Sequence, residues 1–139
     1  MIQYIAEEVK LPTIQKQKIT RWIKDTAATY DKKVGEIAYI FCSDERILEV
    51  NNQYLKHDYY TDIITFDYSE GSVISGDIFI SVDTVRSNSE KFEVSFEDEL
   101  QRILIHGILH LCGQADNTPE LRAEMTRKEN LALQSCSKQ

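Results

Sequence analysis

The sequence predicts an α+β fold, in which a small mixed sheet of about four strands packs against about five helices. Short apolar or alternating segments, typical of strands, occupy residues 2–6, 34–41, 62–68 and 73–81. Segments with the period of helices occupy residues 14–30, 44–54, 82–91, 96–111 and 119–134. No internal repeat, low-complexity segment or linker interrupts them, so we expect one domain over residues 1–139.

The composition is that of a globular protein without a membrane span or a secretory signal. The chain has 139 residues, of which 42% are hydrophobic and 28% charged. No apolar run is long enough to cross a bilayer, and the N-terminus lacks the pattern of a signal peptide. The three cysteines have no framework spacing and are interpreted as reduced thiols, so we expect a cytoplasmic location. The net charge of −7 disfavours bulk attraction to nucleic acid but allows a local basic groove.

The first half of the chain predicts a surface helix followed by a buried strand. One face of the helix collects the apolar residues Ile19, Trp22, Ile23, Ala27 and Tyr30. Its basic residues lie off that face, and a solvated surface is a commoner use for them than phosphate contact. Residues 34–41 are almost continuously apolar, which indicates a strand covered on both faces. The strands at 62–68 and 73–81 are joined by a short link and are expected to be antiparallel neighbours.

Serine and proline residues mark where three further helices are expected to begin. Ser43 can cap the second helix, whose buried face is expected to contain Ile47, Val50, Asn51 and Tyr54. Ser95 precedes a helix that is apolar nearly all round, which predicts a place at the centre of the core. Pro119 begins the last helix, in which Met125 and Glu129 fall on the inner stripe.

Two histidines four residues apart are the most informative feature of the chain. His106 and His110 lie on one side of the predicted helix, because four residues advance about one turn. Gly113 can end that helix in the left-handed conformation, and Asp116 brings a carboxylate three residues later. A lone histidine on such a face is usually a core residue, but this combination favours a three-ligand metal site with an open fourth position. The ligand set suits one Zn²⁺ ion, and other divalent metals are alternatives.

Such a site predicts hydrolytic chemistry. An ion with three protein ligands keeps water in its fourth position and lowers the pKa of that water towards neutrality. Helical zinc peptidases place a glutamate base directly after the first histidine, whereas this chain has Gly107 there. A peptidase is therefore disfavoured.

The residues around this motif resemble the YbeY-type rRNA maturation factors, which are zinc-dependent single-strand endoribonucleases. The resemblance rests first on the pattern H-G-x-L-H-L-x-G at residues 106–113. It extends to N-x-x-Y at residues 51–54, to residues 58–66, to G-D-I at residues 76–78, and to Met125 and Glu129 in the last helix. In all it covers about residues 34–134, and the combination is specific where each piece alone is weak.

Three positions depart from the family pattern. Asp116 stands where the third ligand is usually histidine, and its negative charge is expected to make bound water less acidic. Leu55 replaces an arginine that is linked with activity, and Tyr60 replaces a proline. Lys56 could supply the missing positive charge, although a lysine lacks the planar fork of arginine.

Four more residues have two interpretations each. The family places the polar loop with Lys56 and His57 near its cleft, so these residues are expected to contact substrate; a plain surface role is the alternative. Glu129 is expected either to orient a metal ligand from behind or to form a structural ion pair. Cys112 points away from both histidines, so a core position is favoured over a ligand role.

The resemblance implies a zinc-dependent, single-strand-specific endoribonuclease that acts in late maturation of small-subunit (16S) ribosomal RNA and in ribosome quality control. His106, His110 and Asp116 would hold the ion, and either water or a ribose hydroxyl would attack the phosphate. The implied partners are single-stranded or ribosomal RNA and the small ribosomal subunit, with no DNA and no membrane. Two alternatives stay open: a peptidase-like hydrolase of another substrate, and a non-catalytic ribosome-assembly factor whose metal is structural, which Leu55 keeps in play.

Overall fold

A four-stranded mixed sheet forms the base of the fold. The computed structural model describes residues 1–55 and 61–136. Within them the strands are β1 (Ile2–Ala6), β2 (Lys33–Cys42), β3 (Ile63–Asp67) and β4 (Val73–Ser81), arranged in the order β1-β2-β4-β3. β2 is parallel to both β1 and β4, whereas β3 and β4 are antiparallel. The expectation that the two strands with a short link are antiparallel neighbours is therefore confirmed.

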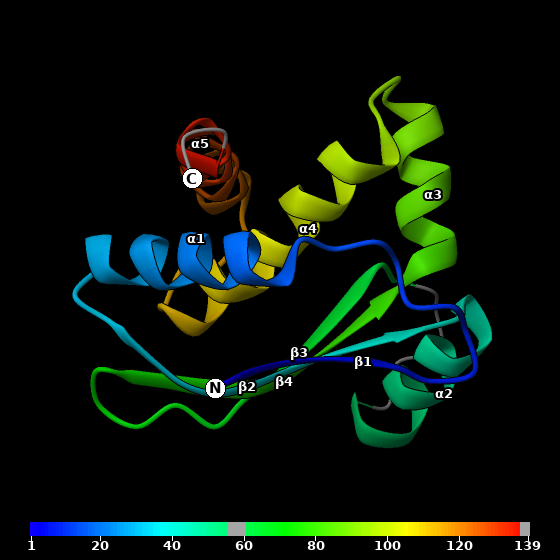
Figure 1. The fold of residues 1–139 in the computed structure, drawn as a ribbon, viewed down its shortest axis with the longest axis horizontal. Coiled ribbons are helices and arrows are strands. Elements are labelled where there is room, and N and C mark those ends of the chain that lie inside the picture. Colours follow the sequence, from blue (N-terminus) through cyan, green and yellow to red (C-terminus); the bar gives the residue numbers. More distant parts are fainter. Residues whose placement is uncertain (56–60, 137–139) are drawn as a thin grey trace.

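Helices cover the two faces of this sheet unequally. The described residues form α1 (Lys16–Thr29), α2 (Asp44–Leu55), α3 (Val82–Lys91), α4 (Phe96–Leu111) and α5 (Pro119–Cys136). Figure 1 shows α1, α4 and α5 above the sheet and α2 below one end of it. A large core lies between the sheet and the upper helices, and a small second core lies between the sheet and α2. The predicted α+β fold is thus confirmed.

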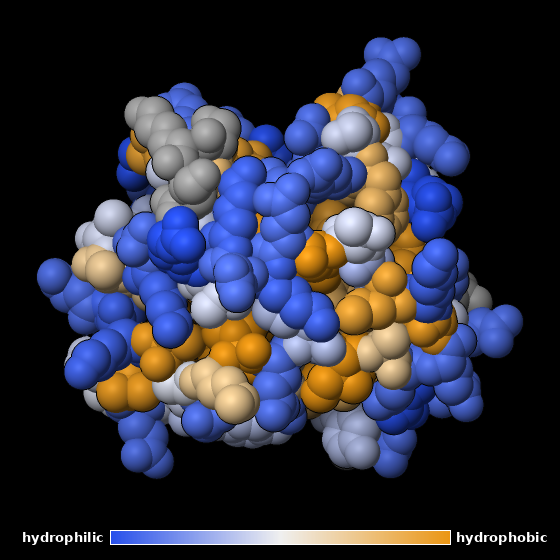
Figure 2. Space-filling view, viewed as in Figure 1, coloured by the Kyte–Doolittle hydropathy of each residue, from blue (hydrophilic) through white to orange (hydrophobic). Residues whose placement is uncertain are grey.

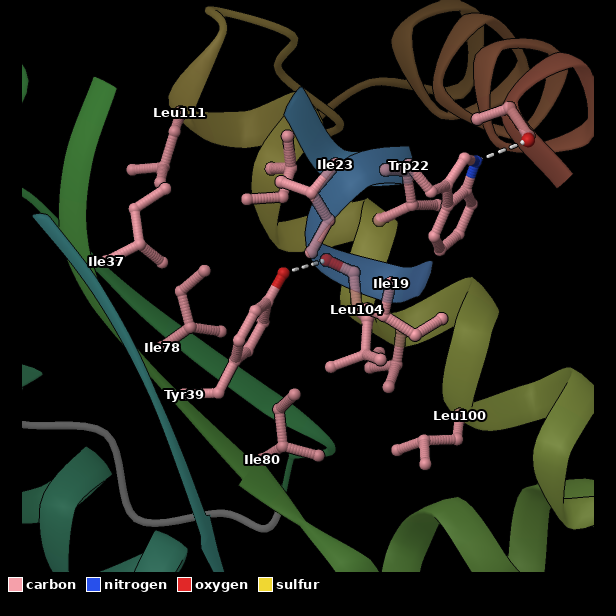
Figure 3. Close-up of a cluster of buried hydrophobic side chains, with 14 of the residues drawn as sticks. Ile19, Trp22, Ile23, Ile37, Tyr39, Ile78, Ile80, Leu100, Leu104 and Leu111 are labelled. Carbon is pink, nitrogen blue, oxygen red and sulfur yellow. Dashed lines mark hydrogen bonds between the residues drawn. The ribbon is translucent and has the colours of Figure 1, made fainter. Parts of the chain in front are cut away.

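The helix that bears both histidines runs through the centre of the large core. Its side chains Leu100, Leu104 and Ile108 are buried, and α4 packs against α1, α3, α5, β3 and β4. The Tyr39 hydroxyl donates a hydrogen bond of 2.8 Å to the Leu104 carbonyl, which ties β2 to α4 (Figure 3). On the other side of the core, the Trp22 indole donates one of 2.7 Å to the Ala132 carbonyl and so joins α1 to α5. A site on α4 therefore has a rigid support.

Gly107 allows α4 to lie close to the sheet. A Cβ atom at this position would meet the side chain of Ile78 at 3.0 Å and that of Ile63 at 3.3 Å. At these distances even a methyl group at position 107 requires the side chains of Ile78 and Ile63 to shift. The position that holds the base in helical peptidases thus faces the sheet in this protein.

The helix ends follow the predicted signals, with one exception in burial. The Ser43 and Ser95 hydroxyls accept hydrogen bonds from the backbone N–H groups of Arg46 and Asp98, as expected of N-caps. Tyr54, however, is 59% exposed, so its assignment to the buried face of α2 was wrong. Its ring lies edge-on to Phe66 of β3, with centroids 5.8 Å apart. Because β3 is an edge strand, the last turn of α2 meets solvent where the sheet ends.

An apolar groove lies at the end of α4 that is remote from the histidines. It measures about 620 Å³ and is lined by segment 9–15, by Val82 of α3, and by Phe96 and Leu100 near the start of α4. Apolar side chains gather between α1 and α3 in the space-filling view, among mostly hydrophilic neighbours (Figure 2).

None of the helices in the described part of the chain is long and apolar enough to span a membrane.

Candidate metal centre

Two imidazoles and one carboxylate converge at the C-terminal end of α4. His106 and His110 stand one turn apart, with ring centroids separated by 4.7 Å. The Asp116 Oδ2 atom lies 3.4 Å from Nε2 of each histidine. One ligand atom from each residue lies within 4.8 Å of the other two. Among the residues that the structure describes, this is the one such group of three or more His, Cys, Asp or Glu side chains.

A glycine turn delivers the carboxylate. Gly113 has a φ of +103°, which strongly favours glycine. The Gly113 N–H donates to the His110 carbonyl, and the Gln114 N–H donates to the Leu109 carbonyl, at 2.9 and 3.0 Å. This pair of bonds is the Schellman pattern, which reverses the chain at the end of a helix. Asp116 is consequently brought back beside the last turn of α4.

The two distances from the Asp116 carboxylate to the histidines suit a tetrahedral ion. Two ligand atoms at ordinary zinc distances and at the tetrahedral angle lie about 3.4 Å apart. Both measured distances from the Asp116 oxygen have this value. Nitrogen and carboxylate oxygen are ligands that Zn²⁺ accepts, and three protein ligands leave a fourth position open. The group could therefore hold a metal ion and bind a further ligand on it.

His106 is also held from its other side, by α5. Its Nδ1 atom donates a hydrogen bond of 2.6 Å to Oε2 of Glu129. The second oxygen of the same carboxylate accepts one of 2.9 Å from Arg102. A carboxylate on Nδ1 leaves the Nε2 lone pair directed towards Asp116, which is the tautomer that a metal requires. Glu129 thus forms an ion pair with Arg102 and also contacts His106, and its role in orienting a metal ligand stays a prediction.

The surroundings shift the two histidines in opposite directions. Burial lowers the pKa of His106, but the hydrogen bond to Glu129 and the charges of Glu129 and Asp116 outweigh it, so its pKa is raised above 6.5. Burial and the neighbouring His106 lower the pKa of His110 below 6.5, and Asp116 offsets only part of that effect.

Further carboxylates lie near His106 and Glu129. Asp62 directly precedes β3. Burial raises its pKa, the charge of Glu129 adds to that effect, and His106 opposes it. Burial also raises the pKa of Glu99, which Arg102 lowers and Asp62 and Glu129 raise. The place of Asp62 near the site depends on how β3 packs on α4. The sequence signal for Arg102 and Glu99 was their position on the same helix edge as His106.

The structure leaves some predicted residues aside. Lys56 and His57, the expected substrate contacts, lie outside the described residues, as does Tyr60. Cys112 is half-buried and packs against the large core, and burial raises the pKa of its thiol to about 11. A thiol that stays protonated is a poor metal ligand, which agrees with the core position favoured for it.

Comparison with known proteins shows the family. The model of the family described as "Endoribonuclease YbeY" matches residues 2–137. A protein named Endoribonuclease YbeY from Phocaeicola vulgatus is 65% identical over 133 residues, covering 96% of each chain. One of the same name from Bacteroides fragilis is 62% identical over 132 residues, covering 95% of each chain. The solution structure of TM1509 from Thermotoga maritima is similar with a TM-score of 0.66 and 25% identity, over 98% of this chain and 89% of that one. The chain belongs to the endoribonuclease YbeY family.

Proposed function

We propose that this protein is a zinc-dependent, single-strand-specific endoribonuclease that acts in late maturation of 16S ribosomal RNA and in ribosome quality control. Its partners would be single-stranded RNA and the small ribosomal subunit, in the cytoplasm. The observation that carries the proposal is the group of His106, His110 and Asp116, with two donor distances of 3.4 Å that suit a tetrahedral ion.

His106, His110 and Asp116 would hold the ion, and the other residues prepare them for it. Zn²⁺ in such a site supplies a Lewis acid for the phosphate and lowers the pKa of a bound water or hydroxyl. Glu129 accepts a hydrogen bond from the Nδ1–H group of His106 and would thereby present Nε2 to the ion. The turn at Gly113 holds the Asp116 carboxylate between the two imidazoles.

The packing of Gly107 supports RNA over peptide as the substrate. A peptidase of the helical type needs a carboxylate base directly after its first histidine. Here the space at that position is filled by Ile78 and Ile63 of the sheet. A side chain at residue 107 would point into the core rather than towards the ion.

The test measures metal content and cleavage of a single-stranded RNA oligonucleotide by the purified native chain and by His110→Ala. We expect about one zinc per native chain, cleavage of single-stranded but not double-stranded RNA, and loss of most metal and activity in the variant. Arg127→Gln is the control, since it removes an exposed pair with Glu124 on α5. Unchanged metal content in His110→Ala would show that the three-ligand assignment is wrong.

The same samples decide between the remaining classes. Cleavage of casein with intact RNA would favour the peptidase-like hydrolase. Metal loss without cleavage of RNA by the native chain would favour an assembly factor with a structural ion. The ribosomal role is tested in cells that carry His110→Ala in place of the native gene, where 16S precursors with uncleaved ends are expected to accumulate.

A further inference from the structure

We propose that Arg102 is a positioning residue of the metal centre, which acts through Glu129 on His106. The inference rests on the proposed metal site. Arg102 lies one turn before His106 on α4 and points to the same residue of α5. It touches none of the three candidate ligands in the contacts described above, so its effect has to pass through the Glu129 carboxylate.

The carboxylate of Glu129 is divided between two partners. Oε1 accepts a hydrogen bond of 2.9 Å from Nη1 of Arg102, and Oε2 accepts one of 2.6 Å from Nδ1 of His106. Two bonds on two different oxygens fix both the place of the carboxylate and the rotation of its plane. The direction of the His106 ring, and with it that of Nε2, is therefore set by a carboxylate that Arg102 orients.

Arg102 is itself anchored at a second point. Its Nη2 atom donates a hydrogen bond of 2.8 Å to Oδ1 of Asn130, the residue after Glu129. The guanidinium plane thus spans two adjacent side chains of α5 and cannot rotate without losing one of them. A lysine ammonium is a point charge and would not hold the same pair of partners with fixed geometry.

Burial explains why Glu129 needs this partner. Its side chain is 9% exposed, whereas that of Arg102 is 35% exposed. An ionised carboxylate in such a place is costly unless a cation and hydrogen bonds compensate it. The nearby carboxylates of Asp62 and Glu99 add to the negative potential. Arg102 supplies the positive charge from the solvent side of this cluster.

A purely structural ion pair between α4 and α5 is the competing explanation, and the affinity for Zn²⁺ separates the two. A structural pair affects the unfolding temperature of the metal-free chain but not the dissociation constant of the folded protein for zinc. A positioning residue changes that constant. We therefore measure Zn²⁺ affinity of the full chain by competition with a chromophoric chelator, with the unfolding temperature recorded for each variant.

The expected loss for Arg102→Gln is about three- to tenfold in Zn²⁺ affinity, somewhat less than is usual for a group that touches the ligand directly. Arg102→Lys should restore part of it, because the charge remains while the fork is lost. The control Arg127→Gln, which removes an arginine–glutamate pair on the exposed side of α5, should leave the affinity unchanged. In a Glu129→Gln background, Arg102→Gln should lower Zn²⁺ affinity less than about twofold, because the carboxylate through which Arg102 acts is already absent.

Native affinity in folded Arg102→Gln would overturn the proposal, even if the metal-free chain unfolds at a lower temperature. An undiminished loss in the Glu129→Gln background would overturn it too. If Arg102→Gln does not fold, Arg102→Lys and Asn130→Ala decide, and native affinity in both contradicts the inference. A native chain that binds zinc through His110 while these variants bind normally refutes this inference alone. Absence of zinc binding by the native chain refutes the proposed site, and the inference with it.

Discussion

The two halves of the candidate metal centre are supported in different ways. His106 is 18% exposed and is held by a helix on each side, through its own position on α4 and through Glu129 of α5. Asp116 is 37% exposed and stands in the turn between those helices, where backbone hydrogen bonds around Gly113 set its place. We call His106 with Glu129 the packed half of the site, because packed side chains hold it. We call Asp116 with the turn at Gly113 the turn half, because a backbone conformation holds it.

The two histidines differ in the direction of their pKa shifts. His106 has a raised pKa because Glu129 and Asp116 outweigh the effect of burial. His110 has a lowered pKa because burial and His106 outweigh Asp116. The same residue type one turn apart on one helix thus differs according to whether a carboxylate stands behind it. The Glu129 carboxylate therefore orients His106 as a ligand and also favours its protonated form, which competes with metal binding.

The largest effect is expected from the packed half. Glu129→Gln removes the charge behind His106 while it keeps the size of the side chain, and we expect Zn²⁺ affinity to fall roughly 10- to 100-fold. The measurement is a competition titration with a chelator. Glu124→Gln is the matched control, since Glu124 lies on the same helix and pairs with Arg127 in solvent. Equal affinities of Glu129→Gln and the native chain would show that the packed half has no effect on the ion.

The turn half is tested by Gly113→Ala. An alanine at a φ of +103° costs about 1–2 kcal/mol or more of folding free energy, and relaxation of the turn should move Asp116 and weaken Zn²⁺ binding. Gly71→Ala is the matched control, because Gly71 has a φ of +58° in the link between β3 and β4, and a Cβ atom meets nothing within 4 Å at either glycine. Both variants should lose stability by chemical denaturation, and only Gly113→Ala should lose affinity. Native affinity in Gly113→Ala would mean that the turn does not control Asp116.

The turn half was the more predictable from sequence. The spacing of His106, His110 and Asp116 around Gly113 is a local matter, because helix periodicity and a left-handed glycine place all of them. The central position of α4 was equally readable from its apolar pattern. That these residues bind an ion stays a prediction.

The packed half depends on how α5 is placed against α4, which no local pattern encodes. Glu129 could be assigned to an inner face, but its partners Arg102 and His106 follow only from the rotation and distance of the two helices. The predicted burial of Tyr54 was wrong for the same reason, because the apolar pattern of α2 does not reveal where the sheet ends. The helices and strands could be predicted from the sequence, whereas most contacts between them could not.

The two histidines should also differ in how they make metal binding depend on pH. Metal binding requires neutral imidazoles, so affinity falls as pH decreases through each histidine pKa, by about tenfold per pH unit for each proton taken up. Because the pKa of His106 is raised, the fall should begin above pH 6.5, and His110 should add to it only below that value. In Glu129→Gln the onset should move to lower pH. An onset that is the same in both proteins would contradict the role of Glu129 in the raised pKa of His106.

The stability of the metal-free chain should depend on pH in the opposite direction to zinc affinity. A raised pKa of His106 means that its charged pair with Glu129 stabilises the folded chain below pH 6.5, and that this contribution is lost as pH rises through the raised pKa. Thermal unfolding of metal-free and zinc-loaded samples over the same pH range should therefore diverge most on the alkaline side. Equal stabilisation by zinc at all pH values would exclude histidine ligands.

The smallest effect concerns the cost of crowding carboxylates in the packed half. Burial, with Asp62 and Glu99 near each other and near Glu129, raises the pKa of Glu99 above 4.5, so its ionised form is disfavoured in the folded state at neutral pH. Glu99→Gln should accordingly raise the unfolding temperature at neutral pH by about 1–3 °C, and the gain should vanish in acid, where Glu99 is protonated. Glu97→Gln is the control, because Glu97 is exposed in the same first turn of α4 and loses the same interaction with the helix end. A larger rise in unfolding temperature for Glu99→Gln than for Glu97→Gln would show that the negative charges around His106 destabilise the folded chain. Equal rises in the two variants would show that they do not.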